Sequence, residues 1–150
     1  MNNTPQRTLV LASTSPFRKA LLQRLDLVFE TLLPQVDETA LQGEPAETMV
    51  KRLSEAKARA GAKQYPNALI IGSDQVAVCD GDVLGKPGNH ENARRQLTRL
   101  AGHRVSFLTG LCLYDASTDA TRLDLVPYHV TFRHLTDQQI ERYPVSYTHL

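Results

Sequence analysis

Short apolar runs alternate with helical patterns along this chain, and this alternation constrains the fold more than any other feature of the sequence. The expected strands are residues 8–12, 28–33, 68–71, 104–114 and 123–132, with a hairpin turn at Asp80–Gly81. The expected helices are residues 17–25, 45–65, 90–100 and a last one starting near 136. Strands that alternate with helices favour an α/β fold built on one sheet.

Composition and charge exclude several classes of protein. The chain has 150 residues, 41% of them hydrophobic, which is enough for one domain with a substantial core. Seventeen basic and sixteen acidic side chains give a net charge of +1, and neither sign forms a long block, so we expect no nucleic-acid partner. No apolar run approaches the roughly 20 residues that a membrane span needs. The polar residues 1–7 lead directly into a strand, so we expect no signal peptide and a cytoplasmic protein.

The cysteines and histidines suggest no site by their spacing. Cys79 and Cys112 form neither a disulfide framework nor a metal motif, and we interpret them as reduced, buried thiols. The five histidines form no ligand-spaced cluster. The chain also lacks the Gly-x-Ser-x-Gly turn of serine hydrolases.

A polar segment between the first strand and the first helix is a candidate phosphate-binding site. Ser13, Ser15 and Arg18 would surround the free N–H groups at the helix start, where anions bind favourably. Ser15 is also a good N-cap and Pro16 suits the first helical position. An ordinary serine cap without any ligand is the simpler alternative.

Acidic and basic side chains near the strand ends are the second candidate group. Ser13, Glu38 and Asp74 each follow a separate expected strand, and a parallel sheet would gather them at one edge, where ligands bind in open α/β folds. Carboxylates beside a phosphate site suggest a hard divalent cation. Lys57 lies in a partly apolar helix stripe, so it either extends to water or reaches an anion. Lys86, in a Gly–Pro loop, is equally ambiguous.

Taken in order, five motifs resemble those of the Maf-like nucleotide pyrophosphatases. These motifs are residues 11–18, residues 36–38, Lys57 after residues 54–56, residues 71–75 and residues 85–87. The resemblance extends from about Leu9 to Arg142. It implies an elongated, mixed-sheet α/β fold with a central cleft, of the Maf and inosine triphosphatase type, and usually a homodimer.

The resemblance also implies a reaction and roles for these residues. The family hydrolyses a nucleoside triphosphate between the α and β phosphates. By position, Asp74 is the expected proton acceptor, and Glu38 with Asp74 would hold Mg²⁺ or Mn²⁺. The expected phosphate-binding residues are Ser13, Ser15, Arg18, Lys57 and Lys86.

Two positions point to one branch of the family. Phe17 and Gln75 resemble the branch that hydrolyses 7-methyl-GTP, whereas the branch acting on dTTP and UTP has Arg and Thr there. Phe17 would lie near a bound base, or alternatively would pack in the core with Leu21. Three further interpretations of the chain are a dTTP/UTP pyrophosphatase, a non-catalytic nucleotide-binding regulator of cell division, and an inactive fragment.

The last residues do not continue the resemblance. The family extends past Arg142 through a Gly-rich segment, whereas residues 144–150 look like a translated transposase adapter of the kind used in sequencing libraries. We therefore expect an incomplete Maf-like domain over residues 1–143 and an artefactual tail over 144–150. A genuine C-terminus is the alternative.

Overall fold

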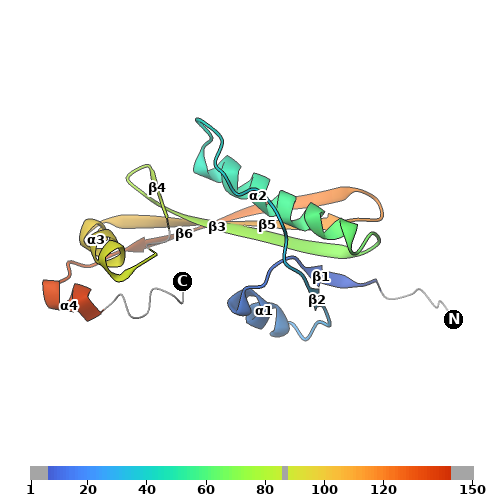
Figure 1. Ribbon diagram of the computed structural model, residues 1–150, viewed down its shortest axis with the longest axis horizontal. Coiled ribbons are helices and arrows are strands. Elements are labelled where there is room, and N and C mark those ends of the chain that lie inside the picture. Colours follow the sequence, from blue (N-terminus) through green and yellow to red (C-terminus); the bar gives the residue numbers. More distant parts are fainter. Residues whose placement is uncertain (1–6, 86–87, 143–150) are drawn as a thin grey trace. The chain divides into compact units, whose positions relative to one another are not determined.

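The computed structural model of the protein describes residues 7–85 and 88–142, with a mixed sheet and helices (Figure 1). The strands are β1 (Leu9–Leu11), β2 (Glu30–Thr31), β3 (Leu69–Cys79), β4 (Asp82–Leu84), β5 (Arg104–Asp115) and β6 (Ala120–Thr131). The helices are α1 (Pro16–Gln23), α2 (Ala46–Ala60), the 3₁₀ turn η1 (Gly61–Lys63), α3 (His90–Leu100) and α4 (Asp137–Arg142). The strand order is β2-β1-β3-β5-β6, with β4 paired to β3, which confirms the mixed α/β class. The expected tail, 144–150, lies outside the described residues.

The chain divides into two compact units. Unit 1 comprises Met1–Gln75 and Thr109–Val126, and unit 2 comprises Val76–Leu108 and Pro127–Leu150. The three long strands β3, β5 and β6 each begin in one unit and end in the other.

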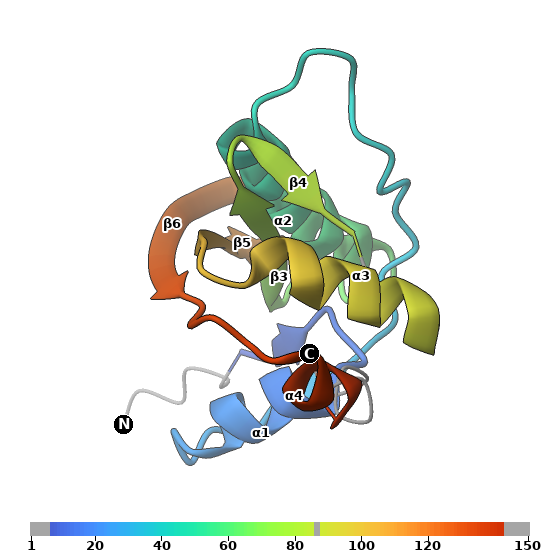
Figure 2. The same ribbon diagram turned by 90° about the vertical axis from the view of Figure 1, so that its left-hand side faces the viewer.

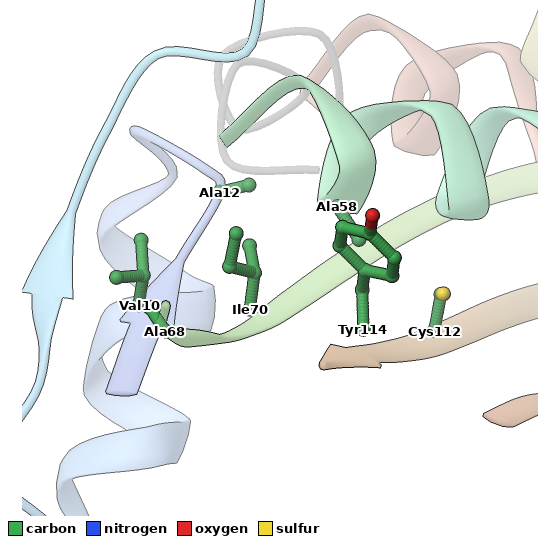
Figure 3. Close-up of a cluster of buried hydrophobic side chains, with 7 residues drawn as sticks. All are labelled: Val10, Ala12, Ala58, Ala68, Ile70, Cys112 and Tyr114. Carbon is green, nitrogen blue, oxygen red and sulfur yellow. The ribbon is translucent and has the colours of Figure 1, made fainter. Parts of the chain in front are cut away.

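Unit 1 contains the parallel part of the sheet. β1 pairs in parallel with β2 and with β3, in the register Leu11 to Thr31 and Leu11 to Ile71. Figures 1 and 2 show α2 along one side of these strands and α1 on the other side. A cluster of buried side chains between α2 and the strands forms the core of this unit (Figure 3); its members are Val10, Ala12, Ala58, Ala68, Ile70, Cys112 and Tyr114.

Two glycines let α2 approach the sheet closely. A Cβ on Gly72 of β3 would collide with the backbone oxygen of Ser54 and lie 2.5 Å from the backbone nitrogen of Ala58. A Cβ on Gly110 of β5 would lie 2.6 Å from Cγ1 of Val50. The helix backbone therefore rests directly on these two strands, and any side chain at Gly72 would push it away.

Two of the strand boundaries expected from the sequence are wrong. The apolar pattern predicts that the third strand ends at residues 72–74, but β3 continues to Cys79 because its second half pairs with β4 in the hairpin at Asp80–Gly81. The second strand covers only Glu30–Thr31 instead of residues 28–33. Val28 is 91% exposed, so the apolar pattern there does not mark a buried strand.

Unit 2 is built around a smaller core. Cys79, Leu100 and Val105 are its buried residues, contributed by β3, α3 and β5. Asn89 caps α3 by accepting a hydrogen bond from the N–H of Asn92, and the helix covers the residues expected from the sequence. None of the helices in the described part of the chain is long and apolar enough to cross a membrane.

Candidate active site

The segment between β1 and α1 is organised by its own serine side chains. The Ser13 hydroxyl accepts a hydrogen bond from the N–H of Ser15 at 3.0 Å, and the Ser15 hydroxyl accepts one from the N–H of Arg18 at 3.3 Å. Ser15 is thus the N-cap of α1 and Pro16 is its first residue, as expected. This geometry agrees both with a ligand site and with a simple helix cap.

Arg18 connects the start of α1 to β3, the strand that carries Asp74. Its Nη1 donates a hydrogen bond to the backbone oxygen of Ser73 at 3.0 Å. Ser73 in turn donates its hydroxyl proton to the backbone oxygen of Gly110 at 2.8 Å, and its side chain is buried. The guanidinium is therefore held one residue away from Asp74 along β3.

Lys57 forms the centre of a cluster of charged side chains. Its Nζ lies 2.7 Å from Oε1 of Glu38 and 3.1 Å from Oδ1 of Asp74. The side chains of Lys57 and Asp74 are only 11% and 13% exposed, whereas that of Glu38 is 61% exposed. The alternative in which Lys57 extends to water is therefore wrong, and two carboxylates from distant segments face one cationic group.

The loop that carries Glu38 is held against α2 by a second ion pair. Arg52 of α2 binds the Glu44 carboxylate through Nε at 2.7 Å, and its Nη2 donates to the backbone oxygen of Thr39. The N–H of Thr39 donates to Asp37, and hydrogen bonds with Thr39 lower the pKa of the Asp37 carboxyl. These contacts fix Asp37 and Thr39, the residues before and after Glu38, and so hold the Glu38 side chain close to Lys57.

Asp74 lies within β3, beyond the point where its parallel partner β1 has ended. Leu11, the last residue of β1, pairs with Ile71, so Asp74 is three positions past the last residue pair. Asp74 therefore lies past the carboxyl ends of β1 and β2, the edge of the sheet where the sequence predicts a site, although Asp74 does not itself end a strand. The sequence could not show this because the hairpin pairing extends β3.

The two expected specificity residues differ in their surroundings. Phe17 is 54% exposed and Leu21 is 59% exposed, and α1 has no buried residue, so the alternative in which Phe17 packs in the core is wrong. Gln75 donates a hydrogen bond from Nε2 to the Thr109 hydroxyl at 2.9 Å. Sequence reasoning missed Thr109, because only the arrangement of β3 beside β5 brings it to Gln75.

The other residues considered from the sequence are Lys86 and the two cysteines. Lys86 lies outside the described residues. Cys79 and Cys112 are both buried free thiols, as expected.

A group of potential metal ligands in unit 2 was not suggested by the sequence. Cys79, Asp80 and His103 each offer one ligand atom within 4.8 Å of the others. Sequence spacing does not indicate this group, because 23 positions separate Asp80 from His103.

Comparisons with known proteins agree with the family suggested by the motifs. The family model described as "Maf-like protein" matches residues 8–150. A protein of Pseudoalteromonas translucida named 7-methyl-GTP pyrophosphatase is 52% identical over 135 residues, which are 90% of this chain and 67% of that protein. A protein of the same name from Methylobacillus flagellatus is 53% identical, over 90% of this chain and 70% of its own length.

A solved structure shows that the fold recurs at low sequence identity. The Ham1 protein of Staphylococcus aureus superposes with a TM-score of 0.59, over 87% of this chain and 73% of that protein, at 17% identity. At this identity the likeness concerns the fold alone.

Proposed function

The chain belongs to the Maf-like family, and we propose that it is a nucleoside triphosphate pyrophosphatase that acts on 7-methyl-GTP. The products would be 7-methyl-GMP and diphosphate, and the reaction would remove a modified nucleotide from the cellular pool. The several relatives at about half identity that carry this name support the substrate. A homodimer, expected from the family resemblance, and a cytoplasmic location stay predictions.

The observation that carries the proposal is the convergence of Glu38 and Asp74 on Lys57. A triphosphate brings several negative charges, which a lysine ammonium can neutralise, while a carboxylate can take the proton of an attacking water. We infer that Asp74 accepts this proton as the water oxygen bonds to the α-phosphorus. The bond from that phosphorus to the bridging oxygen breaks, and diphosphate leaves with the electron pair.

The donor set of Glu38 and Asp74 fits a hard divalent cation such as Mg²⁺ or Mn²⁺. Their oxygens face one cationic group, Lys57 Nζ, at 2.7 and 3.1 Å, and such ions are typically bound by one or two carboxylates together with substrate phosphates. When bound, the ion would neutralise phosphate charge and polarise a phosphoryl oxygen. Glu38 and Asp74 would hold the ion, and Lys57 would bind the phosphates.

The start of α1 supplies the proposed contacts to the phosphates. The Ser13 and Ser15 hydroxyls lie at the start of the helix, where they accept hydrogen bonds from the N–H groups of Ser15 and Arg18, and Arg18 is anchored on the backbone of Ser73. Fixed donors of this kind bind phosphate oxygens with little loss of side-chain entropy. Lys86 is proposed as a further phosphate ligand from its motif alone.

Recognition of the base is assigned to Phe17 and Gln75. N7-methylation places a positive charge on guanine, and an exposed aromatic face attracts such a cation by roughly 0.5–2 kcal/mol. The ring of Phe17 is exposed on α1, near the serines proposed for the phosphates. The amide of Gln75, held by Thr109, could form hydrogen bonds with a base edge.

The test compares 7-methyl-GTP, GTP, dTTP and UTP as substrates with Mg²⁺ and with Mn²⁺, with monophosphate and diphosphate measured by chromatography. A parallel titration follows 7-methyl-GTP fluorescence, so that binding is measured independently of turnover. A higher kcat/KM for 7-methyl-GTP supports the proposal, and equal activity on dTTP contradicts the specificity. Binding without turnover would favour the nucleotide-binding regulator, and no binding would contradict both.

A further inference from the structure

A group of potential metal ligands lies at the corner of the β3–β4 hairpin in unit 2. Cys79 is the last residue of β3, Asp80 follows it in the turn, and His103 follows α3. His103 Nδ1 lies 3.3 Å from Asp80 Oδ2, and Cys79 Sγ lies 3.8 Å from the same oxygen. One ligand atom of each residue lies within 4.8 Å of the others.

Two of these separations are close to the edge lengths of a tetrahedral zinc site. Zinc binds sulfur at about 2.3 Å and nitrogen or oxygen at about 2.0–2.1 Å, so neighbouring ligand atoms lie about 3.3–3.6 Å apart. The nitrogen-to-oxygen separation has this value, and the sulfur-to-oxygen separation exceeds it by a few tenths of an ångström. Small side-chain movements would therefore place all three atoms on one ion.

The backbone holds each of the three residues in place. Cys79 is packed with Leu100 in the core of unit 2, which fixes the position of its thiol. Asp80 has a left-handed φ of +52°, imposed by the tight turn. The N–H of His103 donates to the backbone oxygen of Leu100, and its own oxygen accepts from the N–H of Phe132, both at 2.9 Å.

The surrounding charges favour a cation at this corner. Arg99, the basic residue closest in sequence on α3, is paired with Asp82 at 2.6 Å, so its charge is balanced there. The carboxylate of Asp80 pairs with the His103 ring, which is cationic only when it is protonated. A thiolate, a carboxylate and a neutral imidazole would together balance a divalent ion.

We propose that Cys79, Asp80 and His103 bind one Zn²⁺ ion, with water at the fourth position. The sulfur and imidazole ligands select a borderline ion such as zinc over Mg²⁺, so the site is chemically different from the one proposed at Glu38 and Asp74. Binding releases the thiol proton to solvent and clamps the hairpin to the loop after α3. The site does not depend on the proposed pyrophosphatase activity.

The experiment titrates the reduced full chain with Co²⁺, which replaces zinc and reports a thiolate ligand through a charge-transfer band in the near ultraviolet. Zn²⁺ affinity is then measured by displacement of Co²⁺, and Tm is recorded with and without zinc. We expect one ion per chain to give the thiolate band, and a higher Tm with zinc.

Variants decide whether the three named residues are the ligands. Cys79→Ser should abolish the band. The His103 side chain is half exposed, so the fold should tolerate its loss. His103→Ala should therefore weaken zinc binding by about tenfold or more without unfolding the protein. His129→Ala and Asp74→Asn are the controls and should leave unchanged both the thiolate band and the zinc affinity measured through it. Absence of the band in the wild type, or unchanged affinity in His103→Ala, would overturn the proposal.

Discussion

The ammonium of Lys57 lies 3.1 Å from Oδ1 of Asp74, and both side chains are largely enclosed. One residue comes from α2 and the other from β3, so the contact depends on how closely the helix rests on the strand. Gly72, two residues before Asp74, permits that approach. The charge pair at the proposed active site and the packing of unit 1 are therefore parts of the same arrangement.

Asp74→Asn is expected to keep the fold and lose turnover by about 10²–10⁴-fold, because an amide cannot accept the proton of the attacking water. Lys57 keeps its contact with Glu38 in this variant. Release of diphosphate from 7-methyl-GTP at saturating Mg²⁺ gives the rate, and circular dichroism checks the fold. Hydrolysis near the wild-type rate would remove Asp74 from the mechanism.

Lys57→Met is expected to lower both stability and nucleotide affinity. Methionine fills similar space but leaves the largely buried Asp74 carboxylate without its ammonium partner, which typically costs about 3–5 kcal/mol. Urea unfolding measures the stability, and a 7-methyl-GTP fluorescence titration measures the affinity. Lys63→Met, at an exposed position of η1, is the matched control and should change neither quantity.

Phe17→Ala is expected to reduce the preference for 7-methyl-GTP over GTP more than it reduces the rate with GTP. The lost attraction between the ring and the methylated base corresponds to about 0.5–2 kcal/mol of discrimination. The ratio of kcat/KM for the two nucleotides is the measurement. Leu21→Ala removes a similarly exposed apolar side chain one turn along α1 and should leave the ratio unchanged. An unaltered ratio in Phe17→Ala would exclude the ring from base recognition.

Gly72→Ala is expected to destabilise the protein by at least about 2 kcal/mol, since the added methyl collides with the α2 backbone rather than with a side chain that can rotate. Denaturant unfolding followed by circular dichroism measures the change. Gly85→Ala is the control, because its Cβ would meet nothing within 4 Å and its φ is not positive. Equal stability of the two variants would show that α2 does not rest on β3 as described.

The free energy of unfolding is expected to fall between pH 9 and pH 11 through Cys112. Burial raises the pKa of its thiol from 9.0 to about 11, so the folded state favours the neutral thiol. This stabilisation is present below pH 9 and is lost as the pH rises through 11, by roughly 3 kcal/mol in total. Urea unfolding of wild type and Cys112→Ala at several pH values should show their stability difference shrinking as pH rises. A constant difference would contradict the assignment.

Features that depend on neighbouring residues could be predicted from the sequence. The Ser15 cap with Pro16, the turn at Asp80–Gly81 and the helix over 90–100 all appear as expected. Each is decided by hydrogen bonds and backbone preferences within a few residues. The family motifs add the identity of the candidate site residues.

Features that depend on pairing between distant segments could not be predicted in this way. The hairpin extends β3 past Asp74, and the sheet order places Thr109 beside Gln75. Periodicity detects an apolar strand, but it does not detect a strand that continues through Ser73 and Asp74, because these polar residues interrupt the pattern.

Local elements and the three charged candidates Glu38, Lys57 and Asp74 thus follow from the order of residues along the chain. That Lys57 lies between the two carboxylates instead of extending to water follows from the packing of α2 on the sheet. The meeting of Asp80 with His103 likewise follows from the position of β5 beside β3, because Asp80 follows β3 and His103 precedes β5. Local preferences act between near neighbours in the chain, whereas these charges meet only when packing has fixed the distant segments that carry them.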